Sequence, residues 1–108
     1  MSGFDNREKA EENKSAHDAE IAFKATARRN RLLGEWIADE FLGLSGDARA
    51  AFAKDVVAAD FDRPGDDDVV EFVVAKVTEA GGELTEARLR HKMEELMILA
   101  TAQIKSEV

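Results

Sequence analysis

The sequence changes character at one stretch, Arg28-Arg29-Asn30-Arg31-Leu32-Leu33-Gly34-Glu35-Trp36-Ile37. From this stretch onward, apolar residues recur at the spacing of one helix face, beginning with Leu33, Trp36, Ile37 and Phe41. Before it, residues 6–20 contain no hydrophobic residue other than three alanines. The stretch therefore separates a segment that can build a core from one that cannot.

The composition favours helices and excludes several classes of protein. The chain has 108 residues, one Pro and no Cys, so disulfides, thiolate catalysis and Cys-based zinc sites are all ruled out. No apolar run approaches the roughly 20 residues that a membrane-spanning helix needs, and the N-terminus lacks the features of a secretory signal. We therefore expect a cytoplasmic protein of one domain that does not insert into a membrane.

The charge is distributed unevenly. The formal net charge is −8, which argues against nucleic acid as a partner, since the phosphates would be repelled. Residues 1–31 contain seven Lys/Arg and six Asp/Glu, a net +1, whereas residues 32–108 contain eight and seventeen, a net −9. The N-terminal segment thus differs from the rest in charge as well as in hydrophobicity.

Capping residues and turns predict four helices. The first begins at Asp5, where Glu8 completes a capping-box spacing, and ends near Leu42, before Gly43. The second follows Ser45, a cap, and runs to about residue 60. The third begins in the acidic run 66–68 after Pro64-Gly65 and ends at Gly81-Gly82, and the fourth starts after Thr85 and runs to about residue 105.

The third segment is rich in valine and could instead form a strand. We predict a helix because acidic residues cluster at its start, where the helix dipole favours them, and because no second strand is available for pairing. The stripes expected in the core of the last three helices are Phe52, Val56 and Val57; Val70, Val73 and Val77; and Leu89, Met93, Leu96, Ala100 and Ile104.

The first helix is too long for this bundle. At 1.5 Å per residue, residues 6–42 would span roughly 55 Å, against roughly 20 Å for the second helix. Its N-terminal part could be supported by i,i+4 ion pairs, but each adds only about 0.2–0.5 kcal/mol. Such a helix is marginal alone in water. The prediction is an all-α four-helix bundle over residues 32–108, with residues 1–31 forming a polar, flexible interaction arm.

Catalytic chemistry is not indicated. His17 and His91 lie in charged helical segments without a neighbouring nucleophile or a metal-ligand pattern, and the chain has no Gly-rich phosphate loop. We expect surface histidines, no metal centre and no enzyme activity.

Residues 60–71 partly match the calcium-binding loop of EF-hand proteins. Asp occupies positions one and three, Gly position six and Glu position twelve. Pro64, however, replaces a side-chain ligand at position five, and Asp67 replaces the usual apolar residue at position eight. A capped turn between two helices explains the same acidic residues without a metal.

The basic cluster Arg28, Arg29 and Arg31 has two interpretations. It is either a solvated face that balances an acidic neighbour, or a contact for phosphate or an acidic partner, because the guanidinium fork matches carboxylate and phosphate geometry. Gly34 lies within the same predicted helix, where Gly costs up to about 1 kcal/mol relative to Ala. This predicts a close helix approach or a pivot between arm and bundle.

The order of several short motifs resembles the zeta subunit of the F-type ATP synthase of alphaproteobacteria, an inhibitor of ATP hydrolysis. The motifs are Phe4-Asp5-x-Arg7-Glu8-Lys9, Ala16-His17-Asp18, Phe23, Ala27-Arg28-Arg29-Asn30-x-Leu32-Leu33-Gly34-x-Trp36, Leu44-Ser45-Gly46, Val57-Ala58-Ala59-Asp60-Phe61 and Pro64-Gly65-Asp66-x-Asp68-Val69.

The resemblance implies a regulatory protein that needs no cofactor and is a monomer when free. Its N-terminal segment would insert between the alpha and beta subunits and against the gamma subunit, blocking rotation, so the protein would be peripheral to the inner membrane. The arm residues implied in this contact are Phe4, Asp5, Arg7, Glu8, Lys9, Glu11, Glu12, Lys14, Ser15, His17 and Asp18.

The resemblance also implies regulatory ADP or ATP, for which Arg28, Arg29 and Arg31 are the candidate contacts. The alternative is a helical binding module that responds to nucleotide or calcium and does not inhibit. Members of the family commonly have aromatic residues where this chain has Glu11 and Ser15. Because an aromatic pair at i,i+4 could supply several kcal/mol at an interface, its absence predicts weak inhibition.

Overall fold

The computed structural model describes residues 2–60 and 65–107, and the side chains of residues 17–60 and 65–107. The described residues form helices and no strand. Helix α1 spans Ser2–Ile37 and continues into a short π-helix, η1, at Ala38–Leu42. Helices α2, α3 and α4 follow at Gly46–Ala59, Asp67–Glu79 and Glu86–Glu107. The valine-rich segment is thus helical, as predicted.

The ends of the helices have local causes. Gly43 ends η1 with a left-handed backbone at φ 63°, a conformation that costs glycine no steric energy. The Thr85 hydroxyl accepts a hydrogen bond of 3.1 Å from the amide of Arg88 in the first turn of α4. Ser45 occupies the predicted cap position of α2, but its side chain makes no capping hydrogen bond.

One predicted boundary is wrong. Helix α1 begins at Ser2 rather than at Asp5, so Asp5 lies inside the helix and does not cap it. The chain before Asp5 contains no proline, and extending an existing helix costs far less than nucleating one. The capping-box spacing was therefore insufficient to stop the helix.

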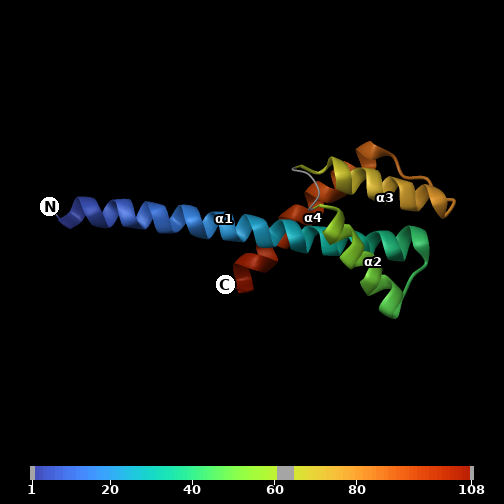
Figure 1. Cartoon of the computed structure of the whole chain (residues 1–108), viewed down its shortest axis with the longest axis horizontal. Coiled ribbons are helices and arrows are strands. Elements are labelled where there is room, and N and C mark those ends of the chain that lie inside the picture. Colours follow the sequence, from blue (N-terminus) through green and yellow to red (C-terminus); the bar gives the residue numbers. More distant parts are fainter. Residues whose placement is uncertain (1, 61–64, 108) are drawn as a thin grey trace.

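Helix α1 is the centre of the bundle and also its longest extension (Figure 1). Its C-terminal half packs against α2 and α4, while α3 packs on α2 and α4. Its N-terminal half continues past them, so the molecule measures 66 × 26 × 22 Å. The radius of gyration is 17.4 Å, against about 13 Å for a compact domain of this length.

The main core lies between α1, α2, α3 and α4. Leu33, Ile37, Val56, Val73 and Leu89 are fully buried in it. The predicted stripes of α3 and α4 are buried throughout, and Val69 adds to the α3 stripe. Val57 of the predicted α2 stripe is instead only partly buried, and Trp36 and Phe41 pack edge-to-face at the rim of the core.

Gly34 lies at the closest approach of α1 and α2. A Cβ atom at Gly34 would lie 2.6 Å from the Cα of Ala53 and 3.2 Å from the Cγ2 of Val56. Real Cβ atoms do not approach a backbone carbon so closely, so only glycine fits here without a shift of one helix. The close-approach interpretation of Gly34 is confirmed.

Substituting Gly34→Ala should lower the free energy of unfolding by about 1 kcal/mol. The added methyl group overpacks the α1–α2 contact, which costs about 1–3 kcal/mol, and this exceeds the helix-propensity gain of up to about 1 kcal/mol. Urea unfolding followed by circular dichroism measures the change. Ala51→Gly, at an exposed position of α2, gives the propensity difference alone. A Gly34→Ala variant as stable as the parent would contradict the packing argument.

Candidate functional site: an arm anchored on the bundle

Among the described side chains, Ile21 is the first residue of α1 that packs against the bundle. Ile21 and Ala25 form a second small core with Ile104 of α4, with Met97 packed against it. Residues 17–20, immediately before it, are exposed. Residues 21–31 therefore belong to the packed part of α1, although the sequence placed them in the arm. Two apolar side chains one turn apart are a weak sequence signal, and their burial depends on the far end of α4.

The candidate arm residues fall into two groups. His17 and Asp18 are exposed, on the last turn of α1 before the bundle. The other side chains lie outside the described residues: those of Phe4, Asp5, Arg7, Glu8, Lys9, Glu11, Glu12, Lys14 and Ser15. Their backbone belongs to α1. Where this helix leaves the bundle, Lys24 pairs with Glu20 at 2.9 Å, one of the i,i+4 pairs predicted from the sequence.

Arg28 ties α1 to the C-terminal end of α4. Its guanidinium donates hydrogen bonds to the amide oxygen of Gln103 at 2.8 Å and to the carboxylate of Glu107 at 3.0 Å. The interaction holds α4 alongside α1 next to the small core, where the arm emerges.

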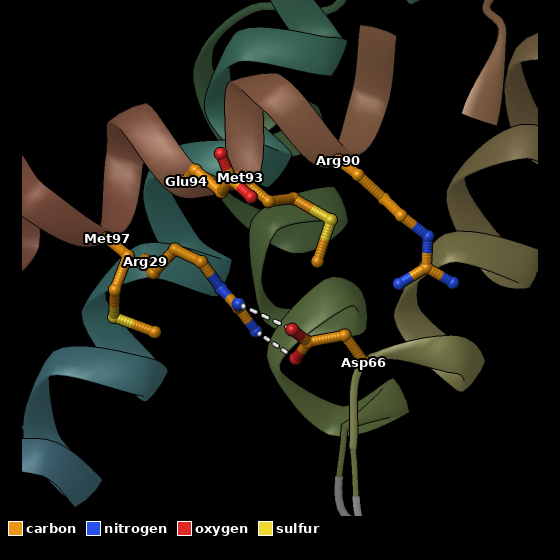
Figure 2. A pocket seen from close by; sticks show the side chains of 6 residues that line it. All are labelled: Arg29, Asp66, Arg90, Met93, Glu94 and Met97. Atoms are coloured by element: carbon orange, nitrogen blue, oxygen red, sulfur yellow. Dashed lines mark hydrogen bonds and ion pairs between the residues drawn. The ribbon is translucent and has the colours of Figure 1, made fainter. Parts of the chain in front are cut away.

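Arg29 ties α1 to the start of α3 (Figure 2). It is 3% exposed and donates two hydrogen bonds to the carboxylate of Asp66, at 2.8 and 3.2 Å. Its Nε donates to the side-chain oxygen of Asn30 at 3.0 Å. The hydrogen bonds from Arg29 lower the pKa of Asp66, against the opposing effect of burial.

The sequence did not reveal this pair. Asp66 precedes α3 and was expected to act with its acidic neighbours at the helix start, yet it makes no capping hydrogen bond. Arg29 and Asp66 are far apart in the chain, so no helical spacing links them. A net excess of acid after residue 31 could have indicated that some of these arginines have acidic partners.

A hollow of about 250 Å³ lies beside the pair, with Arg90, Met93, Glu94 and Met97 in its wall. Arg90 already binds the carboxylates of Asp67 and Glu86, at 2.8 and 2.9 Å. Its charge, like that of Arg29, is therefore balanced by the protein itself.

The three candidate phosphate contacts do not all converge. Arg28 binds α4 and Arg29 binds Asp66, whereas exposed Arg31 lines one hollow with Lys54 of α2 and another with Arg28. For Arg28 and Arg29, the structure agrees with the interpretation that the cluster balances acidic neighbours.

The calcium and metal interpretations gain no geometric support. Within residues 17–60 and 65–107, no three His, Cys, Asp or Glu side chains are grouped so as to hold a metal ion. Asp66 is bound by Arg29, and residues 61–64 of the EF-hand-like stretch lie outside the described residues. His91 is exposed and lies 3.2 Å from Glu95, one turn away on the same helix.

Replacing Asp66→Asn should destabilise the protein near neutral pH by about 1–2 kcal/mol, because buried Arg29 loses its counter-ion; the half-exposed position of Asp66 keeps the loss below that of a fully buried pair. The folded-state pKa of Asp66 lies below its ordinary value, so its contribution is present above about pH 4 and is lost as the pH falls through the folded-state pKa. The gap between parent and variant in urea unfolding should therefore close in acid.

Asp67→Asn is the matched control, because Asp67 is 80% exposed where it pairs with Arg90. A surface pair of this kind contributes about 0–1 kcal/mol. Equal losses for the two variants at neutral pH would mean that the pair of Arg29 and Asp66 does not anchor α1.

Comparisons with known proteins agree with this architecture. A protein with a solution NMR structure shares 44% sequence identity and superposes with a TM-score of 0.70, over 82% of this chain and 99% of that one. No curated protein matches the sequence. The family model of ATPase inhibitor subunit zeta matches residues 1–103, which include both the arm and nearly all of the bundle. The chain therefore belongs to the family of ATPase inhibitor subunit zeta, a family of regulatory, non-catalytic proteins.

Proposed function

We propose that this protein inhibits ATP hydrolysis by the F-type ATP synthase through the arm, defined here as residues 1–20. The family supports the inhibitory role and the interaction with the enzyme. The observation that supports the arm as the effector is the length of α1, which extends from Ile21, the first buried residue among its described side chains, back to Ser2. This part of the helix measures about 28 Å at 1.5 Å per residue.

The proposed mechanism follows from the lack of large apolar side chains in residues 6–20 of the arm. Residues 6–20 offer only alanines as apolar surface, so the arm gains little by packing on its own bundle. A cleft between the alpha and beta subunits, lined by the gamma subunit, would supply the missing surface. The two shorter extents of the molecule are 26 and 22 Å, against about 10–12 Å for a single helix. The bundle would therefore stay outside a cleft that admits one helix, and the inserted arm, tethered to it, would obstruct rotation.

Binding at this cleft should be weak for a member of the family. Glu11 and Ser15 replace the aromatic pair expected from the resemblance, and burying such a pair could supply several kcal/mol. We therefore expect inhibition to require a higher protein concentration, without a change in its mechanism.

Regulation by ADP or ATP also remains a proposal. Arg28 and Arg29 are already bound by Glu107 and Asp66, which argues against a phosphate site made of Arg28, Arg29 and Arg31 together. None of the helices within the described residues is long and apolar enough to cross a bilayer. Association with the inner membrane would then be indirect, through the enzyme.

Deleting residues 1–19, all of the arm except Glu20, should remove most of the inhibition. The full-length chain, titrated into purified ATP synthase from an alphaproteobacterium, should suppress ATP hydrolysis in a saturable manner, and the truncated chain should be at least about tenfold weaker. The melting temperature of the truncated chain should be nearly unchanged, since the deletion ends before Ile21. Equal inhibition by both chains would show that the arm is not the effector, and no inhibition by the full-length chain would contradict the proposed function.

A further inference from the structure

A groove runs between α1 and α2, on the part of α1 that follows the arm. Two neighbouring hollows, of about 320 and 260 Å³, both have Val57 of α2 in their walls. Phe23 and Asn30 of α1 line the first hollow, and Arg31 of α1 and Lys54 of α2 line the second. We call this surface the α1–α2 groove.

The floor of the groove is apolar and its N-terminal end has an exposed aromatic ring. Ala50, Ala53 and Val57 line the second hollow, and Phe23 is 67% exposed beside the first. Large hydrophobic side chains so exposed are few within the described residues, and contiguous exposed apolar surface marks interaction sites. The floor therefore fits apolar side chains of a partner.

Two positive charges that lack a carboxylate partner within the described part of the chain flank this floor. Most lysines and arginines whose side chains are described bind a carboxylate, as Arg49 binds Glu35 at 3.2 Å and Asp39 at 2.8 Å. Arg31 and Lys54 pair with no carboxylate among the described residues, and Glu35, the acid of the same hollow, is held by Arg49. In a chain of net charge −8, two such cations on one apolar hollow select an acidic partner.

The groove also contains a buried hydrogen-bond donor without an acceptor. Asn30 is 1% exposed, and its side-chain oxygen accepts the hydrogen bond from Arg29. The Nδ2 of Asn30 finds no acceptor among the described residues, and Asn30 lines the hollow beside Phe23. Buried donors are nearly always satisfied, so this amide marks the first hollow as a place where an acceptor is missing.

We propose that the α1–α2 groove is a docking site for an acidic, amphipathic helix of a partner protein. The backbone groups of both walls are already hydrogen-bonded within α1 and α2, so the groove offers no edge for an extended strand. A helix instead presents apolar residues at i and i+3 or i+4 to the floor, and carboxylates on the adjacent positions reach Arg31 and Lys54.

This docking site is distinct from the arm, because all of its residues follow Ile21. It extends the proposed function without depending on it: the arm obstructs rotation, whereas the groove binds a second element.

The test is an NMR titration of the ¹⁵N-labelled full-length chain with a synthetic helical peptide of about 15 residues, long enough to form a helix. The peptide carries leucines on one face and glutamates on both flanks, and a second peptide carries lysine in place of every glutamate. The glutamate peptide should shift the side-chain amide signals of Asn30 and the backbone signals of Ala53 and Val57 in a saturable manner. The lysine peptide should not.

Charge reversal supplies the matched variants. The double variant Arg31→Glu, Lys54→Glu should weaken binding of the glutamate peptide by at least about tenfold. Lys105→Glu should leave it unchanged, because Lys105 also lacks a carboxylate partner among the described residues but lies on α4, in a different hollow.

Three results would overturn the proposal: equal binding of both peptides, shifts confined to residues outside the groove, or equal effects of the double variant and Lys105→Glu. Concentration-dependent shifts at Asn30 and Val57 before any peptide is added would assign the groove to a second copy of the chain instead. The peptide contains no part of the ATP synthase, so a negative titration would overturn the docking site without contradicting the inhibitory role of the arm. Likewise, a failure of the chain to inhibit ATP hydrolysis would not contradict the docking site.

Discussion

The close approach of α1 to α2 at Gly34 is the contact on which the rest of the structure depends. With no side chain at Gly34, Ala53 and Val56 of α2 lie directly on the α1 backbone. This places Phe52 and Val56 beside Leu33 and Ile37 in the main core, where α3 and α4 complete the burial. The free energy gained by burying these side chains holds one half of α1 in place and leaves the other half outside.

Two polar interactions determine how far towards the N-terminus α1 stays packed against the other helices. The ion pair of buried Arg29 with Asp66 fixes the start of α3, and Arg28 fixes the end of α4 beside the small core of Ile21, Ala25 and Ile104. On the N-terminal side of Ile21, the described side chains of α1, those of residues 17–20, make no comparable contact with the bundle. The same helix thus serves as core element, as a wall of the α1–α2 groove and as the base of the arm.

Much of the fold could be predicted from the sequence because it depends on local signals. Gly43, Thr85 and the pair Gly81-Gly82 mark helix ends through their own backbone or side-chain chemistry, and the stripes of α3 and α4 follow helical periodicity. Gly34 was informative because glycine inside a helix needs a compensating reason. The one wrong start, at Asp5, came from a capping pattern that does not by itself end a helix.

The site was less predictable because its contacts join distant parts of the chain. Asp66 as the partner of Arg29, and Glu107 as the partner of Arg28, require the packed arrangement of α1, α3 and α4. The groove could not be predicted from the sequence either, because Arg31 and Lys54 line the same hollow only when α2 packs on α1. The polar composition of residues 6–20 and the length of the first helix predicted an arm from the sequence, whereas only the structure located its base at Ile21.

Amide hydrogen exchange of the free, full-length chain tests the central claim most directly, namely that the bundle holds α1 only from Ile21 onward. Amides of residues 25–37 should be protected to nearly the free energy of global unfolding, and amides before Ile21 should exchange almost as fast as in an unstructured peptide. Equal protection on both sides of Ile21, with no partner present, would contradict the account.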